Sequence, residues 1–308
     1  MRFRSLFKAA AAVTLAAAII TASGCSSQKK DNTAEITVGP GDTLAEMTIQ
    51  IGEETGKIRF KLFPEVAPKG VDNFVKLAQS GYYDGKTIHR VIKDFMVQGG
   101  SLRGNGTGGT TADKTEIPRE TNDRMRAYYG ALGYAESSDG INSQFFIINN
   151  KTPFDIAKTA ENISSDLDEY KDRLTEEDKK TYTDYLSKLN ATPDDVRAKY
   201  LSNGGVFSID GNYTIFGQAI EGLDFLDKIS AVEVSSGNTI DDEQGIASKP
   251  AVSVIIKKIE IATIPTITET DATTTTRKSI RPSAATTPAE VTTAAETPAP
   301  ESSTTKSE

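Results

Sequence analysis

The residues of this chain that could do chemistry gather in two segments, 87–100 (TIHRVIKDFMVQGG) and 142–146 (NSQFF). They hold Arg90, glutamine amides, several large apolar side chains and the only histidine, but no evident nucleophile or metal-ligand cluster. Such side chains suit a reaction without a covalent step, which needs an apolar pocket and one well-placed cation. Rotation about an X-Pro peptide bond is such a reaction. Its barrier of about 18–20 kcal/mol comes from amide resonance, and its uncatalysed exchange is slow.

Composition and charge exclude several classes of function. The chain has 308 residues and a net charge of −8, which argues against general nucleic-acid binding because that binding needs a basic surface. The one cysteine, Cys25, excludes an intrachain disulfide and a cysteine-based metal site. Because there is also only one histidine, we expect no metal site and no cofactor.

The first residues are typical of an exported protein. Basic residues precede an apolar run, 9–20, that has the length of a signal-peptide core and is short for a membrane span. Small residues then lead to Cys25 and resemble a bacterial lipobox, although Ala22 stands where leucine is usual. We therefore expect a lipoprotein signal peptide over 1–24, lipid on Cys25 and an extracytoplasmic location on the cell membrane. An ordinary secretory signal with an incidental free cysteine is the alternative.

Both ends of the chain differ in composition from its middle. A polar tether is predicted over 25–46. The segment 264–308 is rich in Thr, Ala, Pro and Ser, and it buries too little apolar surface to offset the entropy of ordering. We expect a disordered tail there and a folded domain over 47–263.

The middle of the chain has the pattern of short β-strands. Alternation predicts strands over 47–51 and 58–62, joined by a turn at 53–56. Pro68 begins a helix with apolar residues at three- and four-residue intervals, which ends at Gly81. Further strands are predicted over 87–92, 95–98, 132–135, 144–148, 213–219 and 252–261, with a loop at 136–142. Many short strands with few helices indicate a closed or nearly closed antiparallel barrel.

A helical segment interrupts this pattern at about 152–205. Its charges alternate in sign, and its apolar residues fall at helical spacing. Thr192 and Pro193 have the pattern of an N-cap followed by proline at the first helical position. We therefore expect a helical insertion in a β scaffold.

Several motifs, in order along the chain, resemble the cyclophilin family of peptidyl-prolyl cis-trans isomerases. They are GKIRFKLFP at 56–64, APKGVDNF at 67–74, GYYDG at 81–85, HRVI at 89–92, FMVQGG at 95–100, GNGTGG at 104–109, SQFFI at 143–147 and DGNYTIFG at 210–217. The resemblance covers about 48–262 without the helical segment. It implies a closed eight-stranded antiparallel barrel capped by two helices, and a prolyl isomerase that needs no cofactor.

The resemblance also implies roles for individual residues. Arg90 matches the catalytic arginine, whose guanidinium favours the twisted amide in which the proline nitrogen has regained its lone pair. Gln98 matches a residue that binds the substrate backbone or holds the arginine. The residues that match substrate-binding positions are Phe95, Met96, Ala135, Gln144, Phe146, Ile209 and Tyr213.

Two departures from the family pattern concern the pocket. Tyr213 stands where many eukaryotic members have histidine, and Ser208 stands where they have the tryptophan that contacts cyclosporin. We therefore predict isomerase activity with weak cyclosporin binding. His89 could suggest acid–base catalysis, but isomerisation transfers no proton. Strand alternation points His89 away from Arg90, so we expect His89 to be structural and hydrogen-bonded within the barrel.

The glycines at 104–109 also fit the dinucleotide fingerprint G-x-G-x-x-G. That fingerprint needs a helix directly after it, and here a polar stretch broken by Pro118 follows. A surface loop is the better interpretation.

Three functions compete at this point. The leading one is a monomeric, lipid-anchored isomerase that binds Pro-containing segments of exported polypeptides and assists their folding. The second is a barrel that holds such segments as a chaperone with little turnover, and the retention of Arg90 favours the enzyme over it. A solute-binding lipoprotein fits the signal segment but not a barrel. The helical segment lies between Phe146 and Ile209, so it is either a lid or client-binding surface beside the pocket or a decorative subdomain.

Overall fold

The structure, a computed structural model, describes residues 36–123, 125–137 and 140–266. The predicted signal peptide, the lipidation site at Cys25 and nearly all of the predicted tail lie outside these residues, so they stay predictions. None of the described helices is both long and apolar enough to cross a membrane.

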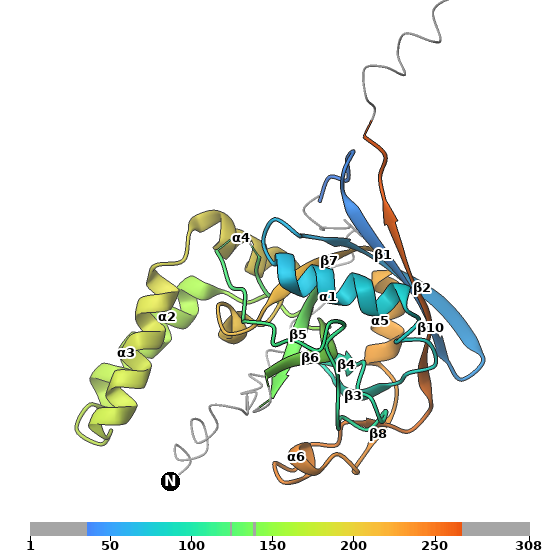
Figure 1. The fold of residues 1–308 in the computed structure, drawn as a ribbon. Helices are drawn as coiled ribbons and strands as arrows, with labels where there is room; N and C mark the ends of the chain where they lie inside the picture. Colours follow the sequence, from blue (N-terminus) through green and yellow to red (C-terminus); the bar gives the residue numbers. More distant parts are fainter. Residues whose placement is uncertain (1–35, 124, 138–139, 267–308) are drawn as a thin grey trace, which may run out of the picture. The chain divides into compact units, whose positions relative to one another are not determined.

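One antiparallel sheet of eight strands forms the body of the domain (Figure 1). In spatial order its strands are β10 (Val254–Thr263), β1 (Thr43–Ile51), β2 (Glu54–Leu62), β7 (Ile215–Glu221), β5 (Ala131–Ser137), β6 (Gly140–Ile148), β4 (Met96–Gly99) and β3 (Ile88–Ile92). The fold is therefore mainly β, as predicted.

The sheet curls, but it is less closed than predicted. Its edge strands β10 and β3 meet at a bridge between Thr87 and Ile255 rather than along a continuous ladder. The reason lies at the outer edge of β3, where the Val91 N–H donates to the Ser248 carbonyl at 2.8 Å. A loop thus covers the edge that β10 would need for full closure.

Two helices pack against the sheet, as the resemblance implied. Helix α1 (Pro68–Gln79) begins with proline, which lacks the N–H that a first turn leaves unpaired, and it packs on β10 and β6. Helix α5 (Leu223–Ser230) packs on β2, β3 and β4. The largest side chains of the core that these helices help to enclose are Met47, Phe60, Phe74, Tyr83, Tyr134, Phe145 and Phe216.

Strand alternation separates two apolar clusters on β6. Phe145 and Ile147 belong to the main core, whereas Phe146 and Ile148 belong to a second cluster on the opposite face. We call this second group the outer apolar cluster; its buried members are Met96, Ala127, Ala131, Phe146, Ile148, Val206, Ile209 and Ile215.

The predicted elements are present, with two differences in the turns. The first hairpin turns at Gly52, which has φ of 57°, and Glu53, so of the predicted turn at 53–56 only Glu53 is in the turn. Gly56, the last residue of the predicted turn, lies inside β2, where a side chain would collide with the Phe225 ring of α5. Of the loop predicted at 136–142, the described residues 136–137 and 140–142 are instead strand, because Glu136 pairs with Ile141 and extends the β5–β6 hairpin.

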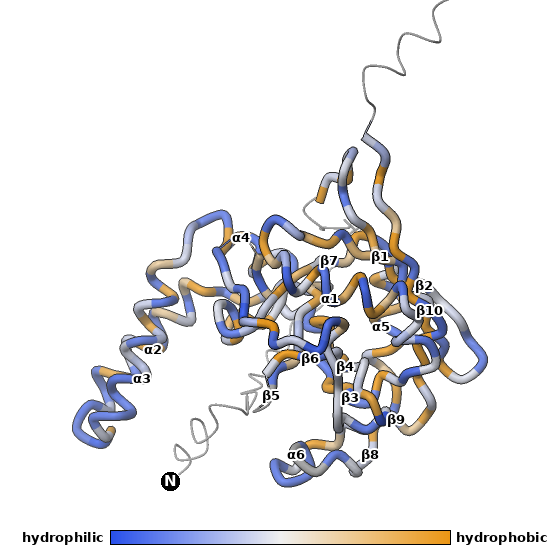
Figure 2. Tube along the Cα trace, viewed as in Figure 1, coloured by the Kyte–Doolittle hydropathy of each residue, from blue (hydrophilic) through white to orange (hydrophobic). Residues whose placement is uncertain are grey.

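The helical segment contains three helices, α2 (Ile156–Tyr170), α3 (Glu176–Asn190) and α4 (Asp194–Asn203). Helices α2 and α3 pack side by side, and the turn that joins them is hydrophilic (Figure 2). The predicted cap of α4 is wrong by one residue. Pro193 is itself the N-cap, and the Thr192 hydroxyl donates to the Lys188 carbonyl of the preceding helix at 2.8 Å.

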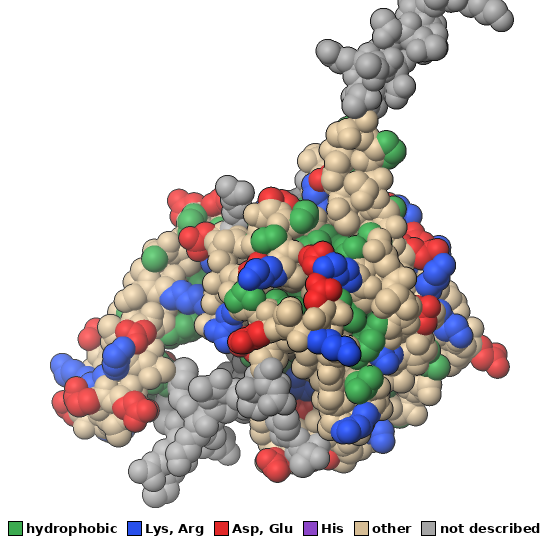
Figure 3. Space-filling view, in the orientation of Figure 1, with side chains coloured by type: hydrophobic (Ala, Val, Ile, Leu, Met, Phe, Trp, Pro, Cys, Tyr) green, Lys and Arg blue, Asp and Glu red, His purple; other side chains and the backbone are tan. Residues whose placement is uncertain are grey.

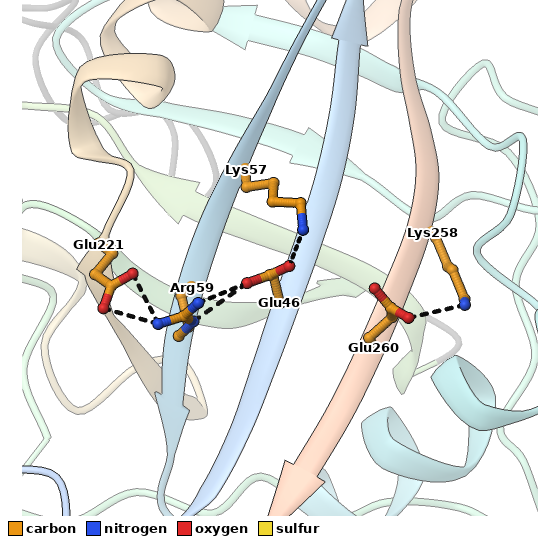
Figure 4. Close-up of polar contacts among 6 residues, drawn as sticks. All are labelled: Glu46, Lys57, Arg59, Glu221, Lys258 and Glu260. Carbon is orange, nitrogen blue, oxygen red and sulfur yellow. Dashed lines mark hydrogen bonds and ion pairs between the residues drawn. The ribbon is translucent and has the colours of Figure 1, made fainter. Parts of the chain in front are cut away.

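The remaining elements are short. They are η1 (Phe207–Ile209), β8 (Val234–Ser235), α6 (Thr239–Asp242) and β9 (Lys249–Pro250). On the face seen in Figure 3, acidic and basic side chains are interspersed. One group of ion pairs crosses the exposed side of β1 and β2, where Arg59 lies between Glu46 and Glu221, at 2.8 Å from each (Figure 4). Exposed pairs of this kind contribute little to stability.

Candidate active site

One row of residues crosses five neighbouring strands of the sheet. Arg90 on β3 pairs with Gln98 on β4, which pairs with Phe146 on β6. The row continues to Gly133 on β5 and Ile215 on β7. Residues paired across antiparallel strands present their side chains to the same face. The two polar residues and the phenylalanine therefore lie on the face opposite the main core.

A chain of hydrogen bonds joins the polar residues of this face. Arg90 Nη1 donates to Gln98 Oε1 at 3.2 Å, and Gln98 Nε2 donates to Gln144 Oε1 at 3.1 Å. Gln144 Nε2 then donates to the carbonyls of Gly106 and Gly108, at 3.0 and 3.1 Å. A guanidinium can only donate and a carbonyl can only accept, so the two ends fix the orientation of both amides. The glycine-rich 104–109 segment is thus a loop that braces the site.

A carboxylate that the sequence did not single out holds the other side of the guanidinium. Arg90 Nε and Nη2 donate to the two oxygens of Asp241, each at 2.6 Å. The Asp241 side chain is 1% exposed and that of Arg90 24%. The Ser248 hydroxyl donates to the same carboxylate. Burial alone would raise the pKa of Asp241, but the hydrogen bonds from Arg90 and then Ser248 outweigh burial and lower it.

The outer apolar cluster lies beside this polar chain. It buries three of the predicted pocket residues, Met96, Phe146 and Ile209. The Phe146 and Tyr213 rings meet edge to face, with centroids 5.8 Å apart. Three predicted residues are partly buried against the cluster, namely Phe95, Ala135 and Tyr213. The structure therefore brings all nine predicted site residues of the domain into two adjoining groups, one polar and one apolar.

Gly133 explains how the Phe146 ring fits on this face. A Cβ atom at position 133 would lie 2.5 Å from Phe146 Cζ and 2.8 Å from Ile215 Cδ1. Only a residue without a side chain lets the ring lie across β5. A glycine inside a strand pattern is a known sign of such a close approach, and this was the signal available in the sequence.

His89 does not make the hydrogen bonds that we expected. It is buried, with 7% exposure, but neither ring nitrogen has a hydrogen-bond partner among the described residues. Burial, and then the neighbouring Arg90 charge, lower its pKa to about 4. The imidazole is therefore neutral at physiological pH, and no proton-transfer role is needed to explain its position.

The helical segment is anchored to the wall of the apolar cluster. Phe207 packs among the residues of that segment, stacking on Phe154 with centroids 5.7 Å apart. Ile209, two positions later in the same 3-10 turn, is buried in the outer apolar cluster. Lys188 on α3 also donates to the Asp210 carbonyl at 2.6 Å. The segment thus contacts the turn that contributes Ile209 to the outer apolar cluster.

Sequence reasoning missed several contributors to this site. Asp241 and Ser248 lie in a polar stretch without periodicity, so nothing in the local pattern pointed to them. Met125, which packs against the outer apolar cluster, precedes a strand as a single apolar residue and carried no signal. Among the described residues, no group of three or more His, Cys, Asp or Glu side chains could hold a metal ion.

The site as a whole offers an apolar surface beside a fixed cation. Three of the five N–H groups of Arg90 have acceptors in the described part of the chain. This leaves one N–H on Nη1 and one on Nη2 for a ligand. A group with an apolar ring and an adjacent lone pair would match both halves of the site.

The chain is similar to known proteins in sequence and in fold. Residues 46–261 match the family model described as cyclophilin type peptidyl-prolyl cis-trans isomerase/CLD. The chain is 33% identical over 217 residues to a Staphylococcus epidermidis protein named "Putative peptidyl-prolyl cis-trans isomerase", which covers 70% of this chain and 92% of that protein. A Staphylococcus aureus protein of the same name is 34% identical, with the same coverage. A cyclophilin type isomerase structure from Cryptosporidium parvum has a TM-score of 0.47 and 21% identity, covering 73% of this chain and 99% of its own.

Proposed function

The chain belongs to the cyclophilin-type peptidyl-prolyl cis-trans isomerases, and from this premise we propose that Arg90 is its catalytic residue. The observation that carries the proposal is the row in which Arg90, Gln98 and Phe146 share one face of the sheet. A cation beside an apolar ring is the combination that would bind and polarise an X-Pro bond, and this supports the proposal.

The catalytic step follows from the change in the prolyl nitrogen. In the planar amide, resonance draws the nitrogen lone pair into the carbonyl, and in the twisted state the lone pair returns to nitrogen. An N–H of Arg90 directed at that nitrogen then gains a hydrogen bond that the planar state lacks. An interaction that is stronger in the transition state than in the ground state raises the rate.

The remaining predicted residues bind the substrate in this proposal. Phe146, Met96 and Ile209, with Phe95, Ala135 and Tyr213 at the edge, supply the apolar surface for the proline ring. Gln98 and Gln144 orient the guanidinium and the backbone of the bound segment. Burial of the ring holds the bond in place while its carbonyl side rotates.

The Arg90→Ala variant tests this assignment against the binding-module alternative. We expect it to lose catalysed exchange of a proline-containing peptide, measured by NMR exchange spectroscopy on the full chain, while the peptide still binds. Gln98 and the apolar surface remain in that variant, so a pure binder would be unaffected. Full isomerase activity in Arg90→Ala would refute the catalytic assignment.

We also propose that the enzyme acts outside the cytoplasm, as a lipid-anchored protein that assists folding of exported polypeptides. The support is the signal-like segment 1–24 that ends at Cys25, together with an activity that suits slow X-Pro steps in folding. Labelling of cells with a clickable fatty acid should mark the wild type and not Cys25→Ala. Equal labelling of both proteins would exclude the anchor.

A further inference from the structure

Arg90 lies on β3, an edge strand of the sheet, and its side chain has a long flexible stem. Gln98 on the neighbouring strand accepts a hydrogen bond from Nη1 only. A single hydrogen bond leaves the guanidinium plane free to rotate about that contact. A second contact, on the side away from Gln98, is therefore needed to fix the orientation of the guanidinium.

Asp241 meets that requirement. Its two oxygens accept from Nε and Nη2, which is the two-point contact that defines the plane of a guanidinium. Together with Gln98 it holds the group on two sides. The N–H groups that stay unpaired within the described part of the chain are one on Nη1 and one on Nη2.

Asp241 lies in the short helix α6, and the segment that follows this helix is itself fastened beside Arg90. The Ser248 carbonyl accepts the N–H of Val91, the residue next to Arg90, at 2.8 Å. The Ser248 hydroxyl donates to the Asp241 carboxylate. The Asp241 carbonyl accepts the N–H of Ile246 at 2.8 Å. The carboxylate is therefore tied both to its own loop and to the strand that bears the arginine.

We propose that Asp241 is a positioning residue for the prolyl isomerase reaction, which aims the Arg90 guanidinium at the prolyl nitrogen. The inference rests on the proposed role of Arg90 and adds a dependence on a loop far from the family motifs. A carboxylate reduces the net charge that the guanidinium presents to a substrate. Its contribution is therefore orientation, and orientation is lost when the two-point contact is lost.

The test is a double-mutant cycle on the full chain, with Asp241→Asn, Arg90→Ala and the double variant. Asp241→Asn keeps the shape but can accept through one oxygen only. We expect it to lower kcat/KM by about 10–100-fold, the scale of a misplaced catalytic group, with little change in the Kd of the proline peptide. We expect the double variant to be no less active than Arg90→Ala, because Asp241 acts through Arg90.

Two further measurements separate positioning from general damage. The Nε–H proton of Arg90 should exchange slowly with solvent in the wild type. In Asp241→Asn the exchange should be faster, and the NMR signal of this group should broaden. Ser248→Ala removes only the hydroxyl that holds Asp241, and it should lower kcat/KM in the same direction but less. This milder variant keeps the test decisive if Asp241→Asn does not fold.

The matched control is Glu46→Gln. Glu46 accepts from the Nε and Nη2 of another arginine, Arg59, at 3.3 and 2.8 Å, through the single oxygen Oε2 and on the exposed side of β1 and β2 (Figure 4). Its kcat/KM should equal that of the wild type. Wild-type or higher kcat/KM in Asp241→Asn, or a loss that adds in full to that of Arg90→Ala, would overturn the positioning role while leaving Arg90 catalytic. An active Arg90→Ala would instead overturn the catalytic assignment itself.

Discussion

Arg90 and Asp241 are 151 positions apart in the sequence and meet through two hydrogen bonds of 2.6 Å. The pair joins the motif-bearing strand β3 to the short helix α6 near the end of the domain. The Asp241 carboxylate is 1% exposed, so it needs the neighbouring Arg90 cation to stay charged. In turn, the carboxylate orients the Arg90 guanidinium in the proposed mechanism.

Arg90→Lys should lower kcat/KM by about 10²–10³-fold, although the positive charge remains. An ammonium is a point charge and cannot hold two carboxylate oxygens and Gln98 in one plane. Arg90→Ala should in addition lower the free energy of unfolding by about 3 kcal/mol, because it leaves Asp241 buried without its partner. Peptide exchange and urea unfolding measure the two effects. Near-wild-type activity in Arg90→Lys would show that charge alone suffices.

Gly133→Ala should disturb the pocket without removing the polar chain. The added methyl would lie 2.5 Å from Phe146 Cζ, so the ring must move at a cost of about 1–3 kcal/mol. We expect weaker binding of the proline peptide, measured by titration. Gly39→Ala is the control, because its methyl would meet no atom within 4 Å. Equal peptide affinities for the two variants would contradict this account of the ring.

His89 should stay neutral down to acidic pH. Burial and the Arg90 charge lower its pKa from 6.5 to about 4. Between these values the unfolded state binds more protons, so stability should fall as the pH drops from 6.5 toward 4. Because the chain has one histidine, a single imidazole signal in the NMR spectrum of the untagged protein reports its titration. A midpoint near 6.5 would show that the ring is solvated.

Cyclosporin should inhibit this isomerase only weakly. Ser208, exposed between the buried Phe207 and Ile209, occupies the position where the family resemblance implies a contacting tryptophan. Ser208→Trp should therefore increase inhibition in the peptide assay. Strong inhibition of the wild type at low cyclosporin concentration would disprove the prediction.

Removal of the helical segment should spare peptide turnover and slow the refolding of a protein whose folding waits on X-Pro isomerisation. The ends of the segment are already adjacent, since Asn150 Nδ2 donates to the Gly205 carbonyl at 3.0 Å. A short Gly-Ser linker can thus replace 152–203. Phe207→Ala in the full chain is the control for damage to the anchoring turn. Unchanged refolding activity after the deletion would favour a decorative subdomain.

Local pattern was sufficient for most of the elements and for the family. Alternation and proline placement predicted the strands and α1, and ordered motifs identified Arg90 and Gln98. The errors occurred at residues whose role depends on contacts between elements that are distant in the sequence. Gly56 looked like a turn residue, but its missing side chain makes room for Phe225.

What the sequence by itself determined is which side chains the site contains: one arginine, two glutamines and several apolar rings on or beside predicted strands. That Arg90, Gln98 and Phe146 share one face follows from the pairing of their strands in the tertiary structure. Only the tertiary structure decided how that arginine is held. Asp241 reaches it through chain folding across the sheet edge, and a contact between residues so far apart leaves no trace in local periodicity. Orientation depends on which groups meet in space, and the order of residues along the chain does not encode that directly.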